Sequence, residues 1–81
     1  MDGDTAKNFL KDLSALLLDE ALKSRQSAID AKGSESEQFQ SGRLMAYSEV
    51  VSLIQMQANI FGIDMIELGL SEIDADKDLR C

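Results

Sequence analysis

The chain has 81 residues, no histidine, no proline and a formal net charge of −7. This length allows one small domain, which on its own buries too little surface to be very stable. Because Cys81 is the only cysteine, neither an intramolecular disulfide nor a cysteine-rich metal site can reinforce the fold. We expect a frayed terminal thiol there, with an intermolecular disulfide as the alternative. Oligomerisation is the remaining common way to enlarge the core.

The acidic balance also restricts the partners. A surface with this charge repels phosphate backbones and anionic membranes, so we expect neither nucleic acid nor a membrane as a partner. The first residues lack the basic and apolar regions of a signal peptide, and no apolar run approaches the ~20 residues that cross a bilayer. We therefore expect a cytoplasmic protein.

The first expected element is a helix over residues 5–31, with Asp4 or Thr5 as its N-cap. Its apolar residues recur at three- and four-residue steps, which is the period of a helix. They are Phe9, Leu10, Leu13, Leu16, Leu17, Ala21, Ala28 and Ile29.

A turn is expected over residues 32–35. Gly33 suits the left-handed conformation that ends a helix. Ser34, followed three residues later by Glu37, predicts a capping box for the next helix. Ser36 is an equally good cap.

The second helix is expected over residues 36–61. Gly62 followed by the apolar Ile63 predicts a helix end of the Schellman type. Beyond it, short helical turns are expected over residues 64–79, with Asp64 and Asp74 as caps and Gly69 as a stop. Leu70 and Ile73 would then cover the end of a bundle. The whole chain, residues 1–81, reads as a single helical domain.

Antiparallel pairing across the turn matches apolar residues with each other. If paired positions sum to about 67, Val50 lies beside Leu17, Ile54 beside Leu13 and Ala58 near Phe9 or Leu10. The sequence therefore predicts an all-α fold, an antiparallel helical hairpin with a short C-terminal helical extension.

One hairpin cannot cover all the apolar surface of the second helix. The stripe expected to remain in water contains Leu44 and Val51, with parts of Met45, Leu53 and Ile60. A patch of this kind marks an interface, and a two-fold pairing of hairpins gives a four-helix bundle. We therefore predict a homodimer with an interface formed by Arg43, Leu44, Tyr47, Val51, Leu53, Gln57 and Ile60.

Three features near this stripe leave alternatives open. Gly42 and Ala46 form a small-residue side that suits either a close helix crossing or a groove for a partner. Arg43 and Tyr47 would anchor that partner, and Arg43 is expected to pair with an acid such as Glu20, Glu37 or Glu49. Gln57 either fixes the register of a buried seam or lies at the solvent edge.

The sequence offers little for catalysis. It has no histidine, no glycine-rich phosphate loop and no Gly-x-Ser-x-Gly motif, so we expect no enzyme, no cofactor and no metal site. The alternation of Asp74, Asp76 and Asp78 is like the start of an EF-hand loop. However, Leu79 occupies the place of the required glycine, and a solvated acidic tail is the simpler reading.

The functional expectation is a non-enzymatic interaction module, a small adaptor or regulator that acts as a homodimer and binds an unknown protein partner. The alternative is an acidic inhibitor or immunity-type protein that binds a basic protein such as a nuclease. Residues 64–81 support this alternative, since their six acidic and two basic residues give a net charge of −4.

Overall fold

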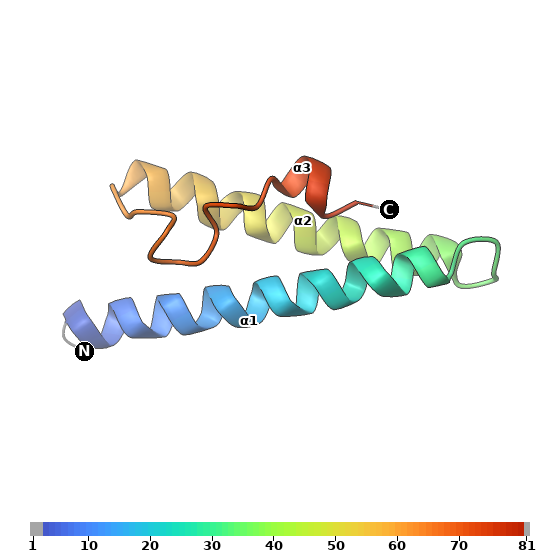
Figure 1. The fold of residues 1–81 in the computed structure, drawn as a ribbon, viewed down its shortest axis with the longest axis horizontal. Coiled ribbons are helices and arrows are strands. Elements are labelled where there is room, and N and C mark those ends of the chain that lie inside the picture. The colour runs from blue at the N-terminus through green and yellow to red at the C-terminus, as the bar shows by residue number, and fades with distance from the viewer. Residues whose placement is uncertain (1–2, 81) are drawn as a thin grey trace.

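A computed structural model of the chain describes residues 3–80, which form helices α1 (Gly3–Asp30), α2 (Glu37–Ile60) and α3 (Ala75–Asp78), with no strand among them. The two long helices pack against each other as an antiparallel hairpin (Figure 1). The all-α hairpin predicted from the sequence is therefore confirmed. The expectations for Cys81 lie outside the described residues.

The turn between α1 and α2 differs in detail from the prediction. Gly33 is left-handed, with φ of +81°, as expected. The capping box at Ser34 is wrong, because Glu37 Oε1 accepts the N–H of Gly33 at 2.6 Å while Ser34 Oγ donates to the carbonyl of Ala31. Ser36 occupies the N-cap position of α2 without a side-chain cap. The left-handed glycine itself thus supplies the donor that the glutamate binds.

The end of α2 has the geometry of a Schellman motif. The N–H of Ile63 donates to the carbonyl of Ala58 at 2.8 Å, and the N–H of Gly62 donates to that of Asn59 at 3.2 Å. Gly62 adopts a φ of +71°, which costs a glycine little because it has no Cβ. This prediction is confirmed.

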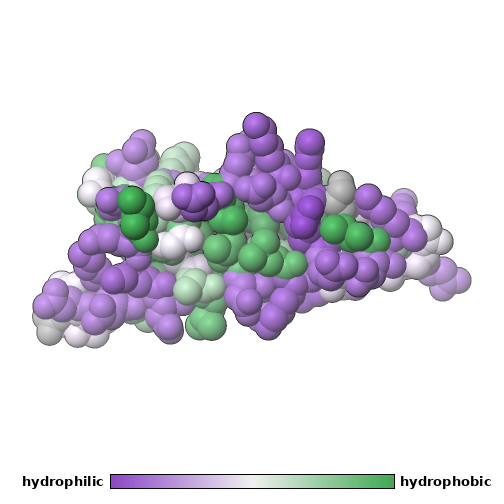
Figure 2. Space-filling view, in the orientation of Figure 1, coloured by the Kyte–Doolittle hydropathy of each residue, from purple (hydrophilic) through white to green (hydrophobic). Residues whose placement is uncertain are grey.

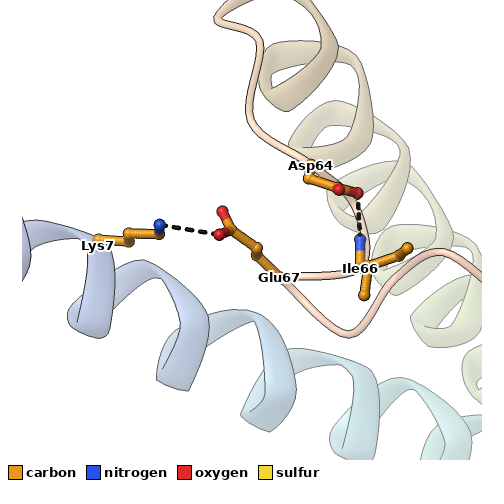
Figure 3. Close-up of polar contacts among 4 residues, drawn as sticks. All are labelled: Lys7, Asp64, Ile66 and Glu67. Carbon is orange, nitrogen blue, oxygen red and sulfur yellow. Dashed lines mark hydrogen bonds and ion pairs between the residues drawn. The ribbon is translucent and has the colours of Figure 1, made fainter.

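Residues 63–80, called the C-terminal segment below, turn back along the hairpin (Figure 1). Asp64 begins the first turn by accepting the N–H of Ile66 at 2.9 Å (Figure 3). Asp74 caps α3 by accepting the N–H groups of Asp76 and Lys77. Both caps match the expectation.

The path of this segment is the main surprise of the fold. We expected Leu70 and Ile73 to cover the end of a bundle. Instead, the segment extends along the length of the hairpin. Near its start Glu67 Oε1 lies 2.9 Å from Lys7 Nζ (Figure 3), and at its end the carbonyl of Arg80 accepts a hydrogen bond from Arg25 Nε at 3.3 Å. The segment therefore forms a third layer on one side of the two helices.

The core lies between these three parts. α1 contributes small buried residues, which allow a close approach of the neighbouring chain: Ser14, Ala21, Ser24 and Ala28. The larger buried side chains come from α2 and the C-terminal segment: Leu44, Val51, Leu68, Leu70 and Leu79. Three of the apolar residues that give α1 its helical period, Phe9, Leu13 and Leu16, lie outside this core and are exposed.

Candidate interaction surfaces

Leu44 and Val51, two residues of the predicted interface, are buried within the chain. Their exposed fractions are 1% and 0%, so the expectation that they lie in water is wrong. The reason is the return of the C-terminal segment. Leu70, Ala75 and Leu79 are themselves buried and belong to the same hydrophobic cluster as Leu44 and Val51.

Polar side chains of α2 fix the C-terminal segment in place. Gln55 Nε2 donates to the carbonyls of Leu70 at 3.2 Å and Ile73 at 2.9 Å, and Ser48 Oγ donates to that of Ala75 at 3.0 Å. Ser48 and Gln55 alternate with Leu44 and Val51 at four- and three-residue steps, and we call these four residues the covered stripe. Sequence reasoning missed the two polar members. The signal available in the sequence was their spacing: Ser48 and Gln55 are seven residues apart, as are Leu44 and Val51, so all four lie on one side of α2.

The opposite side of the hairpin carries a second apolar surface. Side chains two residues apart on a helix point to nearly opposite sides. Phe9 is thus opposite Lys7, which binds the segment, Leu16 is opposite Ser14, and Leu53 is opposite Val51. Ile60 is likewise opposite the buried Ala58. We call this surface the outer face, and its exposed members are Phe9, Leu13, Leu16, Val50, Leu53, Ile60 and Phe61.

The outer face is large for a chain of this size. A large aliphatic or aromatic residue offers on the order of 200 Å² when free, so these seven residues, exposed between 38% and 74%, present on the order of 800 Å². The largest apolar patch of a typical monomer is roughly 300–600 Å². Of the predicted interface residues, Leu53 and Ile60 belong to this face.

A hollow of about 290 Å³ opens between α1 and α2 near the free ends of the hairpin. Its deeper lining comes from half-buried or buried residues: Leu10, Ile54, Ala58, Ile63 and Leu68. Leu53, Gln57 and Phe61 are exposed and surround it. The hollow therefore borders the outer face, and its lining is apolar except for Gln57. Gln57 lies at the solvent edge, which is one of the two positions that the sequence left open.

Arg43 and Tyr47 lie nearer the turn. The Arg43 guanidinium is 5.9 Å from the centre of the half-buried Tyr47 ring, a cation–π distance. Together with Leu17, Ala46 and Val50 they line a shallow hollow of about 200 Å³, which places Leu17 near Val50 as the pairing rule predicted. Within residues 3–80, no ion pair joins Arg43 to the acids proposed for it; Glu20 lies 3.5 Å from Lys23 instead.

Gly42 does not mark a close helix crossing within the chain. It is exposed, and a Cβ built on it would meet no atom within 4 Å. Neither a tight contact within the chain nor a left-handed φ requires a glycine at this position.

Two lysines on the surface, Lys7 and Lys23, form ion pairs with carboxylates. The Glu67 carboxylate, hydrogen-bonded to Lys7, raises the pKa of that ammonium group above its ordinary value, and Asp19 and Glu20 do the same for the pKa of Lys23.

Figure 2 shows hydrophobic residues along the middle of the molecule and hydrophilic residues along its edges. The part of the chain that the structure describes has no cluster of three metal-binding side chains and no helix that is long and apolar enough to cross a membrane.

Comparison with protein-family models, with curated proteins and with solved structures finds no match for this chain. The surfaces described above therefore carry the functional argument.

Proposed function

We propose that this chain is a non-enzymatic interaction module that pairs through its outer face with a second copy of itself, forming a four-helix bundle. The observation that carries this proposal is the outer face. The exposed surfaces of its seven residues sum to on the order of 800 Å², which is comparable to the area that each partner contributes to a standard stable interface.

The shape of the hairpin supports a second copy as the occupant. The molecule extends over 47 × 21 × 15 Å, and helix layers pack about 8–10 Å apart. The shortest dimension, 15 Å, is sufficient for the two helices with the C-terminal segment packed on them. It is too short to include another layer of helices. A second hairpin on the outer face would add a helix layer on the side of the hairpin that the C-terminal segment does not cover.

Two-fold symmetry also suits this face. A two-fold interface brings the same patch of both copies together, so the patch must complement itself. Apolar residues on both helices supply a patch of this kind. The bundle proposed here differs from the one predicted from sequence, because Leu44 and Val51 contribute to the core of each copy and Leu16 and Leu53 to the contact between copies.

The test is the oligomeric state of two matched variants. The wild-type protein is expected to sediment as a dimer at micromolar concentration. Leu53→Asp should sediment as a monomer with unchanged helical circular dichroism, because it places a charge in the contact. Ile66→Asp is the control, since Ile66 is also exposed, at 72%, but lies on the C-terminal segment. A wild-type monomer at that concentration would refute the bundle.

The C-terminal segment favours one second candidate, an acidic inhibitor of a basic protein. Its six carboxylates are all exposed, but Asp74 caps α3 and Glu67 binds Lys7. The informative variant is therefore Glu72→Gln with Asp76→Asn, which leaves the observed caps and the ion pair intact. If this candidate is right, binding to a basic nuclease falls steeply with added salt and in this variant. Binding that is unaffected by added salt and by the double substitution would exclude charge complementarity as its basis.

A further inference from the structure

We infer that the hollow beside Ala58 receives the Phe9 ring of the second copy. The inference rests on the proposed function and assigns the residue that anchors the pairing. Aromatic side chains that fill a desolvated pocket near the centre of an interface provide much of the binding energy of typical complexes.

The hollow has the properties of such a pocket. Its volume of about 290 Å³ leaves room for a large side chain, and its deeper lining is apolar. Leu10 and Ile54 pack against the hydrophobic cluster that contains Ala58 and the buried Leu68 of the C-terminal segment. The pocket is therefore already formed in the single chain, so a partner need not open it.

Phe9 is the aromatic residue placed to enter it. It is 63% exposed on the outer side of α1, whereas Phe61 surrounds the hollow itself and Phe39 lies near the turn at the other end of the hairpin. Phe9 also precedes Leu10, which lines the hollow, so ring and pocket occur at the same level along the hairpin. A two-fold operation that stacks the outer faces at this level brings each ring to the pocket of the other copy.

The experiment uses photo-crosslinking of the full chain. Phe9 is replaced by p-azidophenylalanine, which keeps an aromatic ring, and the protein is mixed with unmodified chain labelled with ¹⁵N. After illumination, mass spectrometry should find cross-links from position 9 to the labelled copy at Leu53, Gln57 or Phe61. The control places the same amino acid at Phe39, which is similarly exposed at 69%, and should give no cross-link to those residues.

Sedimentation separates the failure of this inference from that of the proposed function. Phe9→Ala should raise the dissociation constant of the dimer by roughly 30-fold, as expected for an anchor residue, and Phe39→Ala by less than about 3-fold. A wild-type dimer that cross-links elsewhere, or that tolerates Phe9→Ala, would overturn the anchor and leave the interaction module standing. A wild-type protein that stays monomeric would overturn both.

Discussion

The side-chain amide of Gln55 donates a 2.9 Å hydrogen bond to the backbone carbonyl of Ile73, eighteen residues further along the chain. The same amide reaches the carbonyl of Leu70. One side chain of α2 thus satisfies two backbone acceptors in a stretch outside regular secondary structure. This relationship positions the C-terminal segment over Leu44 and Val51 and gives the molecule one covered and one open side.

Removal of this amide should loosen the segment. We expect Gln55→Ala to lower the free energy of unfolding by about 1–2 kcal/mol, because two part-buried carbonyls lose their donor. Amide exchange should accelerate most between residues 70 and 79. The matched control is Gln57→Ala, two residues away and exposed, which should leave exchange in the segment unchanged. Equal exchange rates in both variants would show that Gln55 does not hold the segment.

Burial separates Leu44 from its neighbour Met45. Leu44 is 1% exposed and Met45 is 63% exposed, although they are adjacent in sequence. Leu44→Ala should lower the free energy of unfolding by about 3 kcal/mol, through lost apolar burial and the cavity that remains. Met45→Ala should change it by less than about 0.5 kcal/mol. Urea unfolding of the two variants measures the difference, and similar values would mean that the segment does not cover Leu44.

Two glycines should respond to alanine with opposite signs. Gly62 has a φ of +71°, which an alanine adopts only with strain, so Gly62→Ala should destabilise the protein by about 1 kcal/mol or more. Gly42 lies within α2 in open space, so Gly42→Ala should stabilise it by about 0.5–1 kcal/mol through better helix propensity. Thermal unfolding at neutral pH reports both. A loss of stability in Gly42→Ala would indicate that something approaches Gly42, which would make that side of the helix a contact surface.

The pair of Lys7 and Glu67 should give a stability contribution that depends on pH. Because the pKa of Lys7 is raised in the folded state, the contribution is complete below the ordinary lysine value of 10.5 and is lost as the pH rises through the folded pKa. The stability difference between wild type and Lys7→Gln should therefore be constant at neutral pH and vanish in strong alkali. Both groups are exposed, so the difference is expected to be small. The same scan of Lys11→Gln, one turn away, supplies the baseline. A difference that persists in strong alkali would rule out the ion pair as its cause.

The features that the sequence predicts well are local ones. Gly33 and Gly62 end their helices as expected because backbone strain and near-neighbour hydrogen bonds decide such ends. The hairpin follows from the apolar period on either side of one turn. For the two glycines the cause lies within a few residues of its effect, and for the hairpin one short turn sets the pairing of both helices.

The candidate surfaces depend on contacts between residues far apart in the chain. Leu44 and Val51 have the pattern of an exposed stripe, and the return of residues 70–79 places Leu70, Ala75 and Leu79 in the same buried cluster. That return depends partly on Ser48 and Gln55, whose polar side chains disrupt the apolar pattern. The sequence therefore predicts an excess of apolar surface correctly but cannot divide it between the chain itself and a partner. Small residues such as Ser14 and Ala21 occupy the side of α1 that faces the core. Larger residues such as Leu16 therefore lie on its exposed side.

The order of the chain has a consequence for synthesis. The ribosome makes the hairpin before the C-terminal segment that covers it, at about 5–20 residues per second. Until residues 70–79 dock, Leu44 and Val51 lack the contacts that Leu70, Ala75 and Leu79 give them in the folded chain. A hairpin at that stage carries apolar surface on both of its sides. Docking of Leu70 and Leu79 closes one of the two sides and leaves the apolar residues of the outer face exposed.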